Sequence, residues 1–332
     1  MIKNLKLEKM SVLVYTENWD GKFKKFTYEL LSYANQIAKD AGTDLVAVSV
    51  GNVSDDELKT LGKYGASKVY NVNDAKFNTM ISQAFTKAIS EVADKESANI
   101  IVFANTYTGR SVAPRVAVRL DAGLVAGCTE LPQSIEPFIV KKKAYSGKAF
   151  ADVKVSADKK ILTFNQNSYK IEEDAKDIAI EVFAPATSDA DFKAKSIDVM
   201  KASDKLDVGD AEILVAGGRG LKTKEKFEVL DQMAEAIGAN CTVACSKPVA
   251  DLDWRPHHEH VGQTGKVVAP NLYFAIGISG AIQHLAGVNS SKVIVAVNTD
   301  KDAPIFEAAD YGIIGDAFEV VPRLIDAIKE LN

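Results

Sequence analysis

The chain has 332 residues, of which 47% are hydrophobic and 26% are charged, and its formal net charge is −5. This composition excludes global disorder, and the acidic balance does not favour nucleic-acid binding. A chain of this length is expected to form two domains, because single cores usually stop growing at about 250 to 300 residues.

The cysteines and the first ten residues indicate the cellular compartment in which we expect the protein. Cys128, Cys241 and Cys245 form no CxxC motif, and their odd number favours buried, free thiols in a reducing environment. The first ten residues, MIKNLKLEKM, show neither an apolar signal-peptide core nor an Arg/Ser-rich transit pattern. We therefore expect a cytoplasmic protein, or one of the mitochondrial matrix if it has already been processed.

The first half of the chain alternates apolar runs with helical patterns. Continuous apolar runs predict buried strands, and apolar residues at helical spacing predict the helices between them. The expected strands are 11–16, 45–50, 68–71 and 99–104, and the expected helices are 25–39, 56–64, 78–95 and 112–121. This alternation predicts a doubly wound α/β sheet with right-handed crossovers.

The turns after two of these strands lack a phosphate-binding loop. The turn after 11–16 carries Glu17 and Asp20, whose charges would repel a phosphate. The turn after 99–104 contains Arg110 and Ser111 and leads into a helix, whose N-terminus could hold an anion with help from Arg110. We favour the simpler interpretation, in which Ser111 caps the helix.

Residues 131–182 differ in character, because turn residues interrupt them often. Short segments at 149–155, 160–166 and 177–183 predict antiparallel strands added to the sheet. The lysine run at 141–143 is expected to lie on a solvated strand edge.

A polar stretch at 184–205 marks the expected domain boundary, and we predict domains over residues 1–204 and 205–332. In the second domain the expected strands are 212–216, 241–246, 272–278, 292–298 and 311–314, and the expected helices are 224–237, 281–286 and 320–331. The predicted fold class is α/β, with two doubly wound, mostly parallel sheet domains, the first with added antiparallel β segments.

Residues 267–291 contain no Asp, Glu, Lys or Arg. A membrane span could explain this stretch, but glycines and a proline interrupt it, and polar residues such as Gln283 and His284 would need partners in lipid. We therefore expect no membrane insertion. Instead, the strand 272–278 runs through Ser279 and Gly280 into a short helix, an arrangement that suits an anion at the helix N-terminus.

Two further glycine turns lie upstream of this stretch. Gly262 and Gly265 bracket Gln263 and Thr264, and glycines allow a backbone to approach a planar ligand closely. The sequence GGRG at 217–220 follows the strand 212–216. It suits a pyrophosphate, and a tight turn with a surface arginine explains it equally well.

Residues 251–260, DLDWRPHHEH, contain three of the four histidines. His257, His258, Glu259 and His260 are all of metal-ligand types, but adjacent residues cannot easily converge on one ion, and no distant Cys or His completes a tetrahedron. We expect no metal, and interpret the loop as the cover of a ligand mouth or as a contact with a partner.

Several of these segments resemble one family. VGQTGK at 261–266, GISGAIQHLAG at 277–287, VNTD at 297–300 and APIFEAADYGIIGDAF at 303–318 are similar to the C-terminal FAD-binding domain of electron transfer flavoprotein alpha subunits. The likeness extends back through AGGRGLK at 216–222, and the first half of the chain matches more loosely.

The resemblance implies a set of residues in contact with FAD. Carried across position by position, these are Arg219, Ser246, Lys247, Gln263, Thr264, Gly265, Lys266, Ser279, Gly280, Ala281, Ile282, Gln283, His284, Asn298 and Asp316. The resemblance directs Thr264 toward the flavin N5 and places His284 beside O2. The family usually has arginine where this chain has Lys247, which keeps the charge but not the planar fork. Asn298 and Asp316 are also common turn residues.

The resemblance further implies an electron-transfer protein rather than an enzyme. It predicts the alpha subunit of a heterodimer that accepts electrons from the acyl-CoA dehydrogenases of fatty acid beta-oxidation and passes them to a membrane flavoprotein-quinone oxidoreductase through an anionic flavin semiquinone. The first domain would be a nucleotide-binding-like scaffold that packs on the beta subunit. Two alternatives stay open: an electron-bifurcating member that oxidises NADH with a second FAD in the beta subunit, and a nicotinamide-dependent dehydrogenase.

Overall fold

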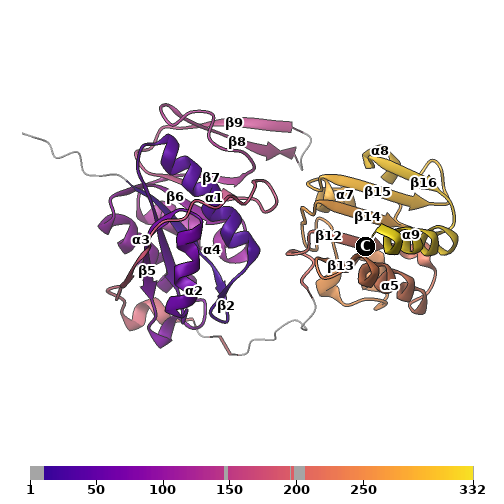
Figure 1. Cartoon of the computed structure of the whole chain (residues 1–332), viewed down its shortest axis with the longest axis horizontal. Helices are drawn as coiled ribbons and strands as arrows, with labels where there is room; N and C mark the ends of the chain where they lie inside the picture. Colours follow the sequence, from indigo (N-terminus) through magenta and orange to yellow (C-terminus); the bar gives the residue numbers. More distant parts are fainter. Residues whose placement is uncertain (1–10, 146–148, 195, 198–205, 332) are drawn as a thin grey trace, which may run out of the picture. The chain divides into compact units, whose positions relative to one another are not determined.

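The computed structural model describes residues 11–145, 149–194, 196–197 and 206–331. The chain divides into two compact units, Met1–Val199 and Met200–Asn332, and each has its own sheet (Figure 1). None of the helices within the described residues is both long enough and apolar enough to span a bilayer.

The first unit contains a nine-stranded sheet in the order β11-β5-β4-β1-β6-β10-β7-β8-β9. The strands from β11 to β7 pair in parallel, whereas β8 pairs antiparallel with both β7 and β9. The strands are β1 (Ser11–Thr16), β4 (Asp44–Val50), β5 (Ala66–Val72), β6 (Ala98–Ala104), β7 (Gly123–Cys128), β8 (Phe138–Ala144), β9 (Ala149–Val155), β10 (Lys160–Phe164) and β11 (Ala179–Val182). A separate short hairpin, β2 (Asn18–Trp19) with β3 (Lys22–Phe23), follows β1.

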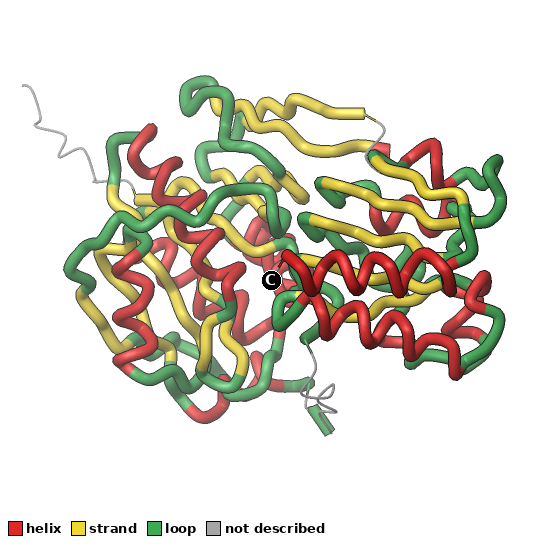
Figure 2. Tube along the Cα trace, turned by 45° about the vertical axis from the view of Figure 1, so that its right-hand side comes forward, coloured by secondary structure: helices red, strands yellow, loops and turns green. Residues whose placement is uncertain are grey.

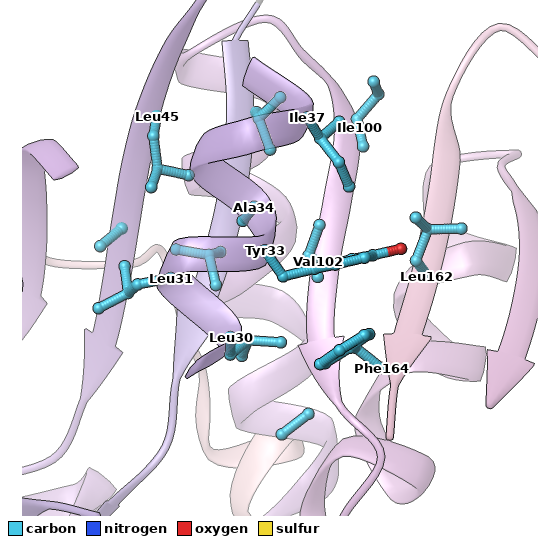
Figure 3. Packing of buried hydrophobic residues seen from close by; sticks show 14 of the residues in the cluster. Leu30, Leu31, Tyr33, Ala34, Ile37, Leu45, Ile100, Val102, Leu162 and Phe164 are labelled. Carbon is cyan, nitrogen blue, oxygen red and sulfur yellow. The ribbon is translucent and has the colours of Figure 1, made fainter. Parts of the chain in front are cut away.

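Helices cover both faces of this sheet. They are α1 (Lys25–Asp40), α2 (Asp55–Lys59), α3 (Ser82–Lys95) and α4 (Tyr107–Arg119). The apolar sides of α1 and α2 pack in one buried cluster, and those of α3 and α4 pack in a second cluster across the sheet. In the first cluster, Tyr33 of α1 stacks on Phe164 of β10 with ring centroids 4.0 Å apart, beside Val102 and Leu162 (Figure 3).

Two of the strands expected to be antiparallel are parallel. The segment 149–155 forms the antiparallel strand β9 as predicted, but β10 lies between β6 and β7 and is parallel to both, and β11 is parallel to β5. The prediction for 160–166 and 177–183 was therefore wrong. The last four residues of β10 are all buried, which is typical of a strand covered on both faces.

Helix α4 begins five residues earlier than expected. Its N-cap is Thr106, whose Oγ1 accepts a hydrogen bond from the backbone N–H of Gly109 at 3.0 Å. Ser111 lies inside the helix, where its hydroxyl is 2.7 Å from that of Ser82. The proposed cap at Ser111 was wrong, because Thr106 already provides the side-chain oxygen that the first turn requires.

The second unit contains a five-stranded, fully parallel sheet in the order β13-β12-β14-β15-β16. Its strands are β12 (Ile213–Gly217), β13 (Cys241–Cys245), β14 (Leu272–Ile276), β15 (Val293–Asn298) and β16 (Tyr311–Ile314). Its α-helices are α5 (Glu228–Ile237), α6 (Lys247–Asp251), α7 (Ile282–Val288), α8 (Ile305–Ala308) and α9 (Ala317–Leu331).

Helices lie on both faces of the second sheet as well. The long helices α5 and α9 lie side by side on one face (Figure 2), and α7 and α8 contribute to the buried cluster on the other. The chain is therefore an α/β protein with two mostly parallel sheets, the first of which carries an antiparallel hairpin. This confirms the predicted fold class.

Candidate functional site

The residues that the resemblance assigns to FAD follow the carboxyl ends of the second sheet. Because β12 lies between β13 and β14, the chain winds in opposite directions from it, and open α/β sheets bind ligands beyond the strand ends at such a point. All five strand ends contribute predicted residues. These are Arg219 after β12, Ser246 and Lys247 after β13, residues 279–284 after β14, Asn298 at the end of β15 and Asp316 after β16.

Three glycines bring the turns after β12 and β14 into backbone contact. The N–H of Gly220 donates to the carbonyl oxygen of Gly277 at 3.0 Å, and a Cβ placed on Gly218 would lie 2.1 Å from the same oxygen. Gly277 has φ +63°, which most other residues avoid. The two turns therefore meet at a distance that leaves no room for a side chain at Gly218 or Gly220.

The turn 262–265 packs against α7. The N–H of Gln263 donates to the carbonyl oxygen of Gln283 at 2.7 Å, and a Cβ on Gly287 would lie 2.4 Å from the Cα of Gly262. Gln263, Thr264 and Gln283 are all exposed. The turn 262–265 and the start of α7 thus lie side by side, and their exposed amide and hydroxyl side chains are those of Gln263, Thr264 and Gln283.

His284 occupies the first turn of α7 and is only 7% exposed. Its Nε2 lies 2.9 Å from the hydroxyl of Tyr273 on β14, and its Nδ1 has no hydrogen-bond partner among the described residues. Burial, followed by the neighbouring His260, lowers the pKa of His284 to about 4. The imidazole is therefore neutral at neutral pH. Beside it, the side chain of Ile282 is exposed, as a contact surface for a planar ring would be.

The histidine loop is organised by an arginine that sequence reasoning missed. The Arg255 guanidinium forms a bidentate ion pair with Asp231 of α5, at 2.9 and 3.2 Å, and a second pair with Glu259 at 2.5 and 3.1 Å. Glu259 is thus engaged by Arg255. Asp231 is 24 residues away from Arg255 in sequence, and no local pattern connects them.

His257 and His258 are exposed, whereas His260 is buried against the turn 262–265. A Cβ on Gly265 would lie 2.7 Å from Nδ1 of His260, so this glycine admits the imidazole ring. Burial, and then the charge of Lys247, lower the pKa of His260. No group of three His, Cys, Asp or Glu side chains that could hold a metal ion occurs in the described ranges.

Lys247 is exposed and forms an ion pair with Asp251. Its Nζ lies 2.9 and 3.0 Å from the two carboxylate oxygens of Asp251, one helical turn further along α6. The i,i+4 spacing is a signal that could have identified Asp251 from the sequence. Ser246, at the N-cap position of α6, is buried, and its N–H donates to the carbonyl oxygen of Gly217 at 3.0 Å.

Three other predicted residues have structural partners of their own. Asn298 Nδ2 donates to the carbonyl oxygen of Ile278 at 3.0 Å, which fixes the turn after β14. Asp316 Oδ1 accepts from the N–H of Phe318 at 2.9 Å at the start of α9. Lys266 forms an ion pair with Asp207. Arg219 is exposed on the turn after β12.

The first sheet has a corresponding point between β1 and β6, where a carboxylate contacts the N-cap residue of α4. The Oγ1 of Thr106, the N-cap of α4, donates to Oε2 of Glu17 at 2.7 Å. The side chain of Arg110 lies over the exposed ring of Tyr107, 5.1 Å from its centroid. Glu17 thus places a carboxylate beside the N-cap residue of α4.

Comparison with protein families gives two matches. A model described as an electron transfer flavoprotein domain matches residues 12–188, and one described as an electron transfer flavoprotein FAD-binding domain matches residues 207–289.

Curated relatives are similar over nearly the whole chain. The electron transfer flavoprotein subunit alpha of Bacillus subtilis is 37% identical over 97% of this chain and 98% of that protein. The electron transfer flavoprotein subunit alpha of Thermoanaerobacterium thermosaccharolyticum is 36% identical over 97% of this chain and 98% of that protein. The acryloyl-CoA reductase electron transfer subunit beta of Anaerotignum propionicum is 34% identical, with 96% of this chain and 95% of that protein covered.

Proposed function

The chain belongs to the family of electron transfer flavoprotein alpha subunits, and from this premise we propose that it carries electrons as the FAD-binding subunit of a heterodimer. Membership supports the electron-transfer role itself. In the proposal, a beta subunit completes the heterodimer, acyl-CoA dehydrogenases donate the electrons, and a flavoprotein-quinone oxidoreductase at a membrane accepts them. We assign the heterodimer to the cytoplasm, or to the mitochondrial matrix.

The carboxyl edge of the second sheet supports FAD as the cofactor, and the observation that carries this proposal is the buried, unpartnered Nδ1 of His284. A buried polar atom without a partner is uncommon and calls for one. The glycine contact between the turns after β12 and β14 includes the exposed Gly220, whose lack of a side chain suits close approach of a pyrophosphate. Gln263, Thr264 and Gln283 add exposed hydrogen-bonding groups beside them.

In this proposal the residues divide by chemistry. Arg219 and the turn 277–281 hold the pyrophosphate, Ser246, Lys247, His284 and the turn 263–266 hold the isoalloxazine ring, and Asn298 and Asp316 take the ribose and adenine side. When bound, FAD supplies the capacity to accept and release single electrons. That chemistry requires neither a nucleophile nor a general base from the chain. It requires groups that stabilise negative charge on the ring.

The chain's own side chains supply such groups in two forms. Lys247 supplies a positive charge, which the neighbouring Asp251 partly compensates. His284 supplies a hydrogen-bonding nitrogen in a buried setting, where a fixed donor interacts more strongly than it would in water.

We propose residues 1–204 as the scaffold domain and residues 205–332 as the FAD-binding domain. The bond between Thr106 and Glu17 supports a scaffold that binds no nucleotide, because it places a carboxylate beside the N-cap of α4, where it would repel a phosphate. The surface of this domain is assigned to the beta subunit.

A second candidate is a carrier that oxidises NADH with a further FAD in the beta subunit. The similarity to an acryloyl-CoA reductase electron transfer subunit supports a carrier whose partner is a reductase, and the NADH and the second FAD are parts of the proposal alone. Membership of an electron-carrier family favours both of these functions over a nicotinamide-dependent dehydrogenase.

Co-purification with a beta subunit from the same organism, followed by flavin and nucleotide counting, tests the proposal. One FAD and one AMP per heterodimer are expected of the simple carrier. Two FAD, with rapid bleaching by NADH, would establish the second candidate. A colourless complex that takes up no FAD on reconstitution would overturn both.

A further inference from the structure

A hydrogen bond joins the centre of the second sheet to the start of α7. Tyr273 lies fully buried on β14, and its hydroxyl is 2.9 Å from Nε2 of His284. We propose that Tyr273 is a positioning residue, which donates its hydroxyl proton to Nε2 and so holds His284 in the neutral tautomer that carries its proton on Nδ1.

The acid and base strengths of the two side chains decide which of them donates. A phenol, with an ordinary pKa of about 10, is a stronger acid than a neutral imidazole, and an imidazole nitrogen, with an ordinary pKa of about 6.5, is the stronger base. The O–H···N arrangement is therefore favoured over N–H···O. Burial raises the pKa of Tyr273 and lowers that of His284 to about 4, so both groups are neutral at neutral pH and the bond joins two uncharged partners.

The direction of this bond determines what the other ring nitrogen can do. In a neutral imidazole one nitrogen is a donor and the other an acceptor. If Nε2 accepts from Tyr273, the buried Nδ1 is an N–H donor. In the opposite tautomer Nδ1 would present a lone pair, which repels a carbonyl oxygen or an anion.

The groups that act on this pair come from neighbouring segments. His260 lowers the pKa of His284, and the backbone of Val261 raises it. Burial, followed by Cys245 on β13, raises the pKa of Tyr273. Burial also raises the pKa of the Cys245 thiol to about 12. The pKa of His260 is also lowered, by burial and by Lys247. Tyr273, His284, His260 and Cys245 are therefore uncharged at neutral pH. The charged side chains that act on His260 are Lys247 and Asp251, and those that act on Cys245 are Glu259 and Arg255.

The consequence for electron transfer rests on the proposed function. With FAD bound beside His284, an N–H at Nδ1 would stabilise the negative charge that arrives with an electron. A ring free to exchange tautomers would offer that donor for only part of the time. Tyr273→Phe removes the hydroxyl and leaves the aromatic ring to fill the core.

The tautomer can be read without reference to electron transfer. Nitrogen NMR of the full chain labelled at histidine gives the protonation of each ring nitrogen, with His284 assigned by its loss in His284→Gln. We expect a protonated Nδ1 and an unprotonated Nε2 throughout the neutral pH range, and a mixed or reversed population in Tyr273→Phe. A wild-type protein with its proton on Nε2 would overturn the inference, whether or not the variant folds.

A double-mutant cycle on the FAD-loaded heterodimer tests the consequence. Tyr273→Phe is expected to weaken uptake of the first electron about tenfold, which is ~59 mV in a one-electron couple. The same change in a His284→Gln background is expected to have less than a twofold effect (~18 mV). Equal shifts in the two backgrounds would show that Tyr273 does not act through His284.

Tyr33→Phe provides a matched control. Tyr33 is fully buried in the first unit, and its hydroxyl donates to the carbonyl oxygen of Glu130 at 3.0 Å. Its loss should leave both the His284 tautomer and the potential unchanged. If the wild-type heterodimer takes up no FAD, the proposed function fails while the NMR result still decides the tautomer. If FAD binds and Tyr273→Phe leaves the tautomer unchanged, the inference alone fails.

Discussion

Lys247 and Asp251 form an ion pair across one turn of α6, with the ammonium within 3.0 Å of both carboxylate oxygens. Their side chains are 57% and 49% exposed, so the pair contributes little to folding stability. Its importance lies in the electric field that the two charges create at the candidate site. The positive charge that stands where the family usually has arginine is accompanied by a negative one, and the effect of Lys247 on a ligand is reduced accordingly.

We expect opposite changes in potential from the two members of this pair. A full charge at about 4 Å and an effective dielectric of 20 would contribute ~4 kcal/mol, and exposure and pairing reduce this considerably. Lys247→Ala should lower the first reduction potential of bound FAD, and Asp251→Asn should raise it, each by about one decade or ~59 mV. Spectroelectrochemical titration of the heterodimer measures both. Shifts of the same sign in the two variants would contradict this account.

Gly218→Ala should destabilise the second unit, because the added Cβ would lie 2.1 Å from the carbonyl oxygen of Gly277. Overpacking of this kind costs about 1–3 kcal/mol. Urea unfolding measures the loss, and retention of FAD should fall with it. Gly209→Ala is the control, since its Cβ would meet only the end of the Asp207 side chain at 3.1 Å. Equal stability of the two variants would argue against a tight backbone contact at Gly218.

The lowered pKa of His284 predicts a loss of stability in mild acid. The folded value of about 4 lies below the ordinary 6.5, so the unfolded chain binds the proton more tightly and stability falls as pH drops through this interval. Between pH 7 and 5 the loss from this group should be about 2 kcal/mol. Urea unfolding of the wild type and of His284→Gln at pH 7 and at pH 5 isolates this loss of stability. An identical pH dependence in the two proteins would show that His284 is not buried as described.

Thr106→Val should destabilise the first unit by about 1–2 kcal/mol, because it removes the N-cap of α4. It also removes the hydrogen bond to Glu17. Glu17→Gln keeps an acceptor at the same place and should cost less than Thr106→Val. Chemical unfolding followed through the first unit provides the comparison. A larger loss in Glu17→Gln would mean that the carboxylate matters more than the cap.

The sequence predicted the strands of the second unit well, because each is an apolar run that ends in a glycine or a polar turn, but it did not predict the short helices α6 and α8. It did not predict the position of β10. A run of five residues specifies a strand, but its neighbours β6 and β7 are chosen by the return of the chain from the β8–β9 hairpin, which no local pattern encodes.

The sequence identified the turns of the candidate site but not the contacts between side chains that hold them in place. Glycines and polar residues marked 217–220, 262–265 and 277–284 directly. The pairing of Tyr273 with His284 depends on how a strand packs under a helix, and that of Arg255 with Asp231 depends on contacts between distant segments. Tyr273 in the sequence is one apolar residue among several in a buried strand.

The carboxylate of Glu17 accepts a hydrogen bond from the N-cap residue of α4 and therefore lies beside the start of this helix. Because Glu17 directly follows β1 in the chain, its local concentration beside α4 is set by the fold rather than by the medium. The first sheet thus combines the strand order of a nucleotide-binding fold with a carboxylate beside the start of α4, and we expect this carboxylate to disfavour a phosphate there.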